Sequence, residues 1–139
     1  MKISSLRPAY VEFIPKQLED GVLYISQRFQ TASHLCCCGC KTKIVTPLRN
    51  AEYKLTSKGD QVSLSPSIGN WDHPCQSHYW IENNAVILAA PMTKAQILAG
   101  RASDAAFRDA YFTKAAWPWY RQFGSRIRMA WNNFWKAWC

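Results

Sequence analysis

The sequence predicts an α+β fold, with a small antiparallel β domain in residues 1–90 and two helices in residues 91–139. Up to residue 90, short runs of β-forming residues alternate with turn residues, which is typical of short paired strands. From Met92 onward the large apolar residues recur at helical spacing instead. Hydrophobic residues make up 48% of the 139 positions and charged residues 19%, a composition that excludes a disordered chain.

The first twenty residues are mixed in character and contain Pro8 and Pro15, so we expect an extended N-terminal arm with little regular structure. They contain no continuous apolar segment of the kind found in signal peptides. No stretch of the chain approaches the ~18 apolar residues of a membrane span. We therefore expect a cytoplasmic protein whose thiols stay reduced.

Six segments of the β domain have strand character. Residues 22–26 and 31–35 are rich in β formers, and residues 43–48 alternate briefly before stopping at Pro47. Residues 51–56 and 61–65 form a further pair around the turn sequence SKGD, in which Gly59 tolerates a positive φ. Residues 66–75 form a loop by composition, and residues 78–90 predict a hairpin that turns at Asn83–Asn84.

The C-terminal extension is predicted to be helical, basic and rich in tryptophan. Thr93 caps a first helix, which we expect to be interrupted at Gly100, and Pro118 begins a second. Residues 89–139 carry a net charge of +6, and five of the seven tryptophans lie in the last 23 residues. An apolar stripe on this second helix favours self-association or contact with a membrane surface, which would make the protein membrane-peripheral. Nucleic acid is an unlikely partner because no recognised binding motif accompanies the charge.

Two distant clusters of metal-ligand residues are the strongest chemical signal in the chain. The segment HLCCCGC (34–40) contains one histidine and four cysteines, and PCQSHYW (74–80) contains a Cys-x-x-His pair. A structural zinc ion takes four such ligands, and a small β domain often needs a metal as a staple. Six residues compete for the four places: His34, Cys36, Cys38, Cys40, Cys75 and His78. Cys37 is excluded because it should point away from its neighbours.

Two other readings of the cysteines are weaker. A disulfide framework would close very small loops, since four of the six cysteines lie within five residues. A Rieske-like iron–sulfur centre uses two cysteines and two histidines, and Cys75 with His78 is similar to half of such a site. The first cluster has the wrong order for that centre, with His34 before its cysteines.

Three motifs together resemble an uncharacterised bacterial family of small zinc-binding proteins. They are HLCCCGC (34–40), LSPSIGNW (64–71) and PCQSHYWI (74–81), and the resemblance covers roughly residues 8–110. Members of that family are encoded beside ubiquitin-like proteins and their activating and conjugating enzymes, in bacterial ubiquitination-like (Bub) operons. The resemblance implies a role in conjugation or deconjugation, with a ubiquitin-like protein and its conjugating enzyme as candidate partners.

This context suggests chemistry for Ser67 and a histidine. Deconjugation cleaves an amide bond, which requires a nucleophile, a base and an oxyanion pocket. Ser67 lies between Pro66 and Gly69, where a hydroxyl can be held exposed. If zinc takes Cys36, Cys38, Cys40 and Cys75, both His78 and His34 are free to act as the base; if zinc takes His78, only His34 remains.

The sequence thus predicts a zinc-containing peptidase that processes or deconjugates a ubiquitin-like protein. Its catalytic candidates are Ser67, His78 and His34, and its metal candidates are Cys36, Cys38, Cys40 and Cys75. Two alternatives stay open: a non-enzymatic, zinc-stabilised binding module for a ubiquitin-like protein or conjugating enzyme, and a Rieske-like redox protein. No G-x-S-x-G elbow of a serine hydrolase is present in the chain.

Overall fold

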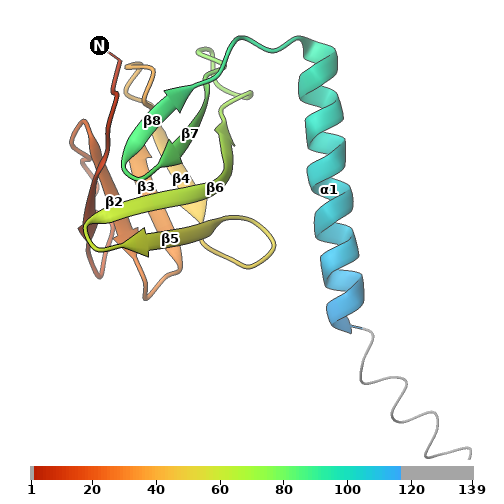
Figure 1. Ribbon diagram of the computed structural model, residues 1–139, viewed down its shortest axis with the longest axis horizontal. Helices are drawn as coiled ribbons and strands as arrows, with labels where there is room; N and C mark the ends of the chain where they lie inside the picture. The colour runs from red at the N-terminus through yellow and green to blue at the C-terminus, as the bar shows by residue number, and fades with distance from the viewer. Residues whose placement is uncertain (1, 117–139) are drawn as a thin grey trace, which may run out of the picture. The chain divides into compact units, whose positions relative to one another are not determined.

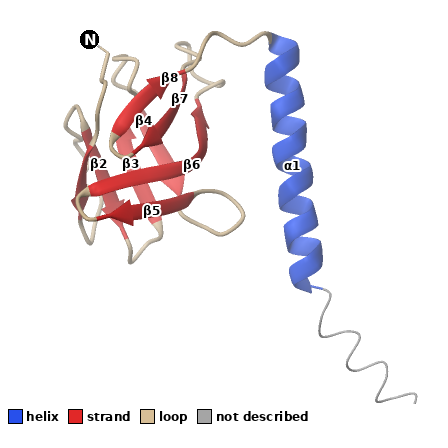
Figure 2. Cartoon of the chain, viewed as in Figure 1, coloured by secondary structure: helices blue, strands red, loops and turns tan. Residues whose placement is uncertain are grey.

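The computed structural model describes residues 2–116, whose backbone forms eight strands and one helix (Figures 1 and 2). The chain divides into two compact units, Met1–Leu98 and Ala99–Cys139. All eight strands belong to the first unit. The second helix expected from Pro118 onward, together with its apolar stripe, lies outside the described residues.

The first sheet has the strand order β1-β2-β3-β4. Its strands are β1 (Arg7–Tyr10), β2 (Val22–Ser26), β3 (Thr31–Leu35) and β4 (Lys43–Pro47). β1 pairs with β2 in parallel, whereas the other pairs are antiparallel. The prediction of an unstructured arm was therefore wrong for residues 7–10. Leu6, which precedes β1, is buried in the core, and this burial fixes the segment against β2.

The second sheet has the strand order β5-β6-β7-β8 and is antiparallel throughout. Its strands are β5 (Lys54–Lys58), β6 (Gln61–Gly69), β7 (His78–Glu82) and β8 (Ala85–Leu88). The predicted turn at Asn83–Asn84 is confirmed, with φ values of 48° and 68°. Asparagine is one of the few residues that tolerates this left-handed region. The predicted SKGD turn is shorter than expected, because β5 begins and ends later than the predicted strand over 51–56 and the chain turns only at Gly59, with a φ of 59°, and Asp60.

β6 is longer than the sequence indicates. The predicted loop over residues 66–75 begins only after Gly69, because the strand continues beyond Pro66. β6 advances four residues, from Leu64 to Ile68, while β7 advances two, from Ile81 to Tyr79. This bulge accommodates a proline, since a bulged residue donates no hydrogen bond to the ladder. It also leaves Ser67 within a strand rather than in a loop.

The two sheets share one hydrophobic core. Side chains from both sheets, together with Cys36 and Cys37, form a single buried cluster. The sheets contribute Leu23, Ile25, Ala32 and Ile44 on one side and Val62, Leu64, Ile68, Tyr79 and Ile81 on the other. Burying side chains of this size stabilises a fold by about 1.5–3 kcal/mol each. The first unit is therefore held by packing between sheets as well as by strand pairing.

The helix α1 (Lys94–Ala116) begins where the sequence predicts. The Thr93 backbone N–H donates to the Gln96 side chain at 2.9 Å, and the Gln96 N–H donates to the Thr93 hydroxyl at 3.3 Å, which is a reciprocal cap. The helix continues through Gly100, so the predicted interruption there was wrong. A single glycine costs a helix only about 1 kcal/mol. No helix within residues 2–116 combines the length and apolarity that a membrane span requires.

Candidate active site and metal centre

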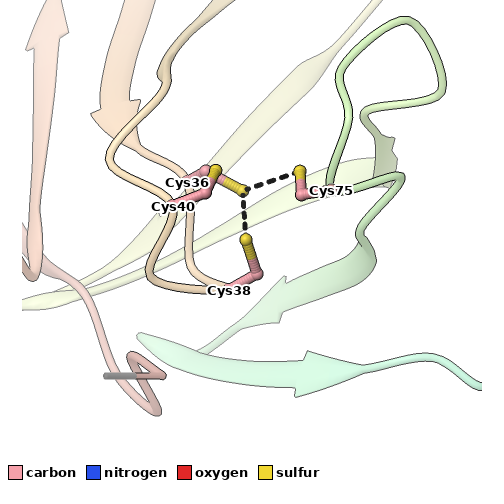
Figure 3. Close-up of side chains that lie close together, drawn as sticks. All are labelled: Cys36, Cys38, Cys40 and Cys75. Carbon is pink, nitrogen blue, oxygen red and sulfur yellow. Dashed lines mark hydrogen bonds between the residues drawn. The ribbon is translucent and has the colours of Figure 1, made fainter.

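Four cysteine sulfurs converge between the two sheets (Figure 3). They belong to Cys36, Cys38, Cys40 and Cys75, and all lie within 4.8 Å of one another. The Cys36 sulfur is 3.4 Å from that of Cys38 and 3.9 Å from that of Cys75. Among the described residues, the structure thus brings together the four cysteines that the sequence singled out.

The β3–β4 connection, residues 36–42, presents three of the four thiols. Its tight turn uses the Gly39 N–H, which donates to the Cys36 carbonyl at 3.1 Å, and Gly39 has a φ of 93°. A side chain at that φ would be strained, so glycine is the residue that allows the turn. The fourth thiol, Cys75, comes from the β6–β7 connection, residues 70–77, which belongs to the other sheet.

The donor set fits a tetrahedral metal ion. Zinc bonds thiolate sulfur at about 2.3 Å, which places neighbouring sulfurs about 3.8 Å apart in a tetrahedron. The observed separations of 3.4 and 3.9 Å lie close to that spacing. The cluster found among residues 2–116 contains no histidine, so it does not match a Rieske-type centre with two cysteine and two histidine ligands.

The thiols that flank the turn differ in acidity. The hydrogen bond with the Thr42 hydroxyl, at 3.3 Å, lowers the pKa of Cys40 to about 6. Burial raises the pKa of Cys38 to about 12. A bound cation would overcome this difference, because metal coordination deprotonates a thiol outright.

Two residues of the first motif lie outside the cluster. Cys37 is fully buried in the core, and burial raises the pKa of its thiol to about 12. His34 is also fully buried, and its Nε2 forms a 2.8 Å hydrogen bond with the Tyr79 hydroxyl. Burial lowers the pKa of His34 to about 4. A neutral, hydrogen-bonded histidine in this position is part of the core.

Ser67 and His78 form a hydrogen-bonded pair on β6 and β7. The Ser67 Oγ lies 2.8 Å from the His78 Nε2. His78 pairs with Gly69 in the ladder, and the bulge in β6 brings Ser67, two residues earlier, alongside it. Bulges commonly re-aim side chains next to active sites. This pairing is the arrangement required for a serine nucleophile and its base.

Two indole rings enclose His78. The ring centroids of Trp71 and Trp80 lie 5.1 and 5.0 Å from that of the imidazole. Trp71 fits only because residue 69 is glycine: a Cβ on Gly69 would lie 2.4 Å from the Trp71 Nε1. Burial between these rings lowers the pKa of His78. The imidazole is therefore kept neutral and able to accept a proton near pH 7.

The second ring nitrogen of His78 has no hydrogen-bond partner. Nδ1 is buried and unpaired within residues 2–116, so the structure shows a Ser–His pair without a third residue to orient the base. A buried polar atom without a partner carries a desolvation cost. The imidazole instead packs against the tilted rings of Trp71 and Trp80, at interplanar angles of 53° and 45°.

A short polar network joins the thiol cluster to the Ser–His pair. The Asn70 side-chain amide donates to the Ser77 hydroxyl at 2.9 Å and contacts the Cys36 sulfur at 3.4 Å. The Ser77 hydroxyl lies 3.0 Å from the same sulfur. Because Ser77 directly precedes His78, the cluster fixes the start of β7 and the position of the imidazole.

Sequence reasoning missed three supporting residues: Asn70, Ser77 and Trp80. Asn70 and Ser77 are small polar residues in a loop, which by themselves predict only turn formation. The alternation in β7 does place Trp80 on the same face as His78, so this contact had a signal in the sequence.

The chain matches one protein-family model over the part that contains this site. Residues 10–89 match the family described as bacterial ubiquitination-like system serine protease (BubE). The chain belongs to this family. The match covers well over half of the chain and includes the four clustered cysteines, Ser67 and His78. No curated protein and no solved structure gives a significant match.

Proposed function

We propose that this BubE-family chain is a zinc-containing peptidase that processes or deconjugates a ubiquitin-like protein, with Ser67 as the nucleophile and His78 as the general base. The observation that carries the proposal is the 2.8 Å hydrogen bond between the Ser67 Oγ and the His78 Nε2. Membership of a family described as serine proteases of a bacterial ubiquitination-like system supports the reaction class and the ubiquitin-like partner.

The reaction proceeds by acyl transfer. The Ser67 Oγ attacks the carbonyl carbon at the end of the ubiquitin-like protein, and the His78 Nε2 takes the hydroxyl proton. The tetrahedral intermediate collapses, the C–N bond breaks, and His78 gives its proton to the leaving amine. Water then attacks the Ser67 ester with His78 again as base, which releases the carboxylate and restores the hydroxyl.

His78 is the preferred base over His34 because of their surroundings. Accepting the Ser67 proton at Nε2 requires the tautomer with hydrogen on Nδ1, and the Trp71 and Trp80 rings hold the imidazole in the required orientation. His34, by contrast, is fully buried and hydrogen-bonded to Tyr79. A base must reach the proton that it removes.

In this proposal, zinc is held by Cys36, Cys38, Cys40 and Cys75. A site closed by four thiolates supplies folding energy rather than an open position for substrate. Its ligands join the β3–β4 connection to the β6–β7 connection, and Cys36 and Asn70 hydrogen-bond to Ser77, the residue before His78. Elemental analysis tests the metal, because the same ligand set also accepts iron.

The test is cleavage of a purified ubiquitin-like protein from the same operon fused to a C-terminal reporter. Ser67→Ala and His78→Gln should each lower the rate by at least about a hundredfold, with metal content and folding unchanged. Ser57→Ala is the matched control, since Ser57 is exposed on β5. Binding of the fusion without turnover by the unaltered protein would favour the binding-module alternative.

A further inference from the structure

An open pocket of about 650 Å³ lies beside Ser67. It extends over the face of the second sheet that points away from the core and is lined by residues of β5, β6 and β7. Ser67 is one of its lining residues, so the pocket is continuous with the proposed nucleophile. β6 lies between β5 and β7 in this sheet, and Figure 1 labels the three strands.

The shape of the pocket follows from the alternation of small residues along β6. Val62 is buried in the core and lies outside the pocket, whereas Ser63, Ser65 and Ser67 line it. The other β6 residues of its lining are Gln61, Pro66 and the largely buried Leu64. Longer side chains stand on both flanks: Thr56 and Lys58 on β5, and Trp80 and Glu82 on β7. The pocket is therefore a trough whose floor is β6, with mostly short side chains, and whose walls come from the two neighbouring strands.

The dimensions of the trough select an extended chain. Adjacent strands lie about 4.8 Å apart, so the walls on β5 and β7 are separated by about 10 Å between backbones. A helix with its side chains is about 10–12 Å across and does not fit between them. The floor from Gln61 to Ser67 is shortened by the bulge, because the four steps from Leu64 to Ile68 pair with only two steps of β7. At about 3.3 Å per regular step, its length is about 15 Å. An extended peptide of about five residues fills that length.

We propose that this trough binds, in extended form, about five residues on the acyl side of the bond that Ser67 attacks. The inference rests on the proposed function, because that reaction makes the tail of the ubiquitin-like protein the acyl group. The trough thus selects a flexible, unfolded tail and rejects amide bonds within folded segments. Binding energy gained away from the reacting carbonyl then contributes to catalysis.

The experiment uses acetylated alanine peptides of one to eight residues with an aminomethylcoumarin leaving group. With the full chain, kcat/KM should rise with each added residue and level off near five. Ser65→Leu raises the floor and Thr56→Tyr extends a wall; both residues are exposed at the pocket, and leucine and tyrosine suit strands. Each variant should lower kcat/KM for the longest peptide about tenfold, which is the usual cost of a mismatched contact in a pocket.

Two controls separate this inference from the proposed function. Ser57→Leu, on β5 but outside the pocket, should leave the length dependence unchanged. Hydrolysis of p-nitrophenyl acetate should be lost in Ser67→Ala and retained in Ser57→Leu; if Ser67→Ala keeps it, the serine mechanism fails.

Peptide binding to the trough can be measured without turnover. Uncleavable alanine peptides should shift the backbone NMR signals of β5, β6 and β7 in Ser67→Ala, with an affinity that increases up to about five residues. A kcat/KM or an affinity that does not depend on peptide length would overturn the trough. An equal loss for short and long substrates in both Ser65→Leu and Thr56→Tyr would also overturn it.

Discussion

His78 owes its proposed role as a base to two neighbouring indoles. Protonated imidazole cannot accept the Ser67 proton, so activity should fall as pH drops through the pKa of His78. Burial lowers that pKa below the ordinary value of about 6.5, and the acid limb of kcat/KM should therefore lie below pH 6.5. Trp80→Ala, which exposes one face of the ring, should move the limb upward toward 6.5. A limb that stays in place in this variant would contradict the role of Trp80.

Gly69 leaves the space in which Trp71 packs against the same imidazole. A methyl group there would lie 2.4 Å from the Trp71 Nε1 and must displace the indole that covers His78. Gly69→Ala should lower kcat/KM by roughly ten- to a hundredfold, because small displacements of a positioned group have effects of that size. Gly100→Ala is the control, at a helical position of α1 where an added Cβ meets open space. Equal activity of the two variants would show that Trp71 does not position the base.

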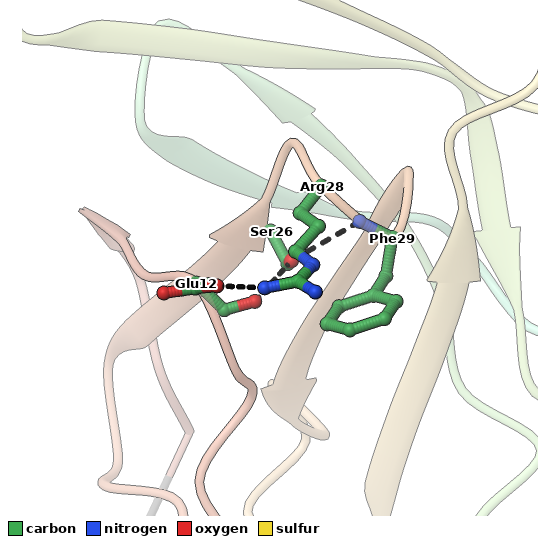
Figure 4. Close-up of polar contacts among 4 residues, drawn as sticks. All are labelled: Glu12, Ser26, Arg28 and Phe29. Atoms are coloured by element: carbon green, nitrogen blue, oxygen red, sulfur yellow. Dashed lines mark hydrogen bonds and ion pairs between the residues drawn. The ribbon is translucent and has the colours of Figure 1, made fainter.

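At the scale of single elements, Ser26 ties β2 to the segment after β1 (Figure 4). Its buried hydroxyl donates to the Glu12 carbonyl at 2.7 Å and accepts from the Phe29 N–H at 3.3 Å. Ser26→Ala should lower the free energy of unfolding by about 1–3 kcal/mol, since it leaves polar groups unpaired. Arg28→Ala removes an exposed ion pair with Glu12 and should cost less than about 1 kcal/mol. Denaturant titrations compare the two, and an equal cost would contradict this assignment.

Elements defined by local chemistry were predictable from the sequence, and elements defined by distant pairing were not. The bounds of β2 and β3 and the turn at Asn83–Asn84 follow from β-forming runs and residues that accept positive φ. The parallel strand β1 depends instead on burial of Leu6 and on pairing with Val22 across fifteen positions. The extension of β6 past Pro66 similarly depends on a bulge opposite β7, which no local pattern indicates.

At the scale of the whole molecule, the two parts of the candidate site differ in how far the sequence predicted them. The thiol cluster follows from a local pattern, whereas the Ser67–His78 pair depends on distant pairing. The close spacing of cysteines in the sequence predicted the thiol cluster, because cysteines so near one another are typical of metal sites. The contact between Ser67 and His78 was a hypothesis drawn from a family resemblance. Its geometry depends on a register shift between two strands, and the contact of Trp71 with His78 depends on the space left by Gly69. No local sequence pattern indicates either the Ser67–His78 contact or the position of Trp71.

The thiol cluster joins connections of the two sheets, so loss of the proposed zinc ion should affect the whole first unit. Cys75→Ser removes the only ligand contributed by the β6–β7 connection among the four clustered cysteines. We expect bound zinc to fall well below one ion per chain and the free energy of unfolding to drop by at least about 3 kcal/mol. The proposed peptidase activity should fall with it, because the Cys36 sulfur that contacts the Ser77 hydroxyl, next to His78, is then no longer held by the metal. Cys37→Ala is the matched control: this neighbouring cysteine is buried outside the cluster, and its variant should keep its metal. Full metal content in Cys75→Ser, measured by elemental analysis, would show that the sulfurs converge for packing rather than for coordination.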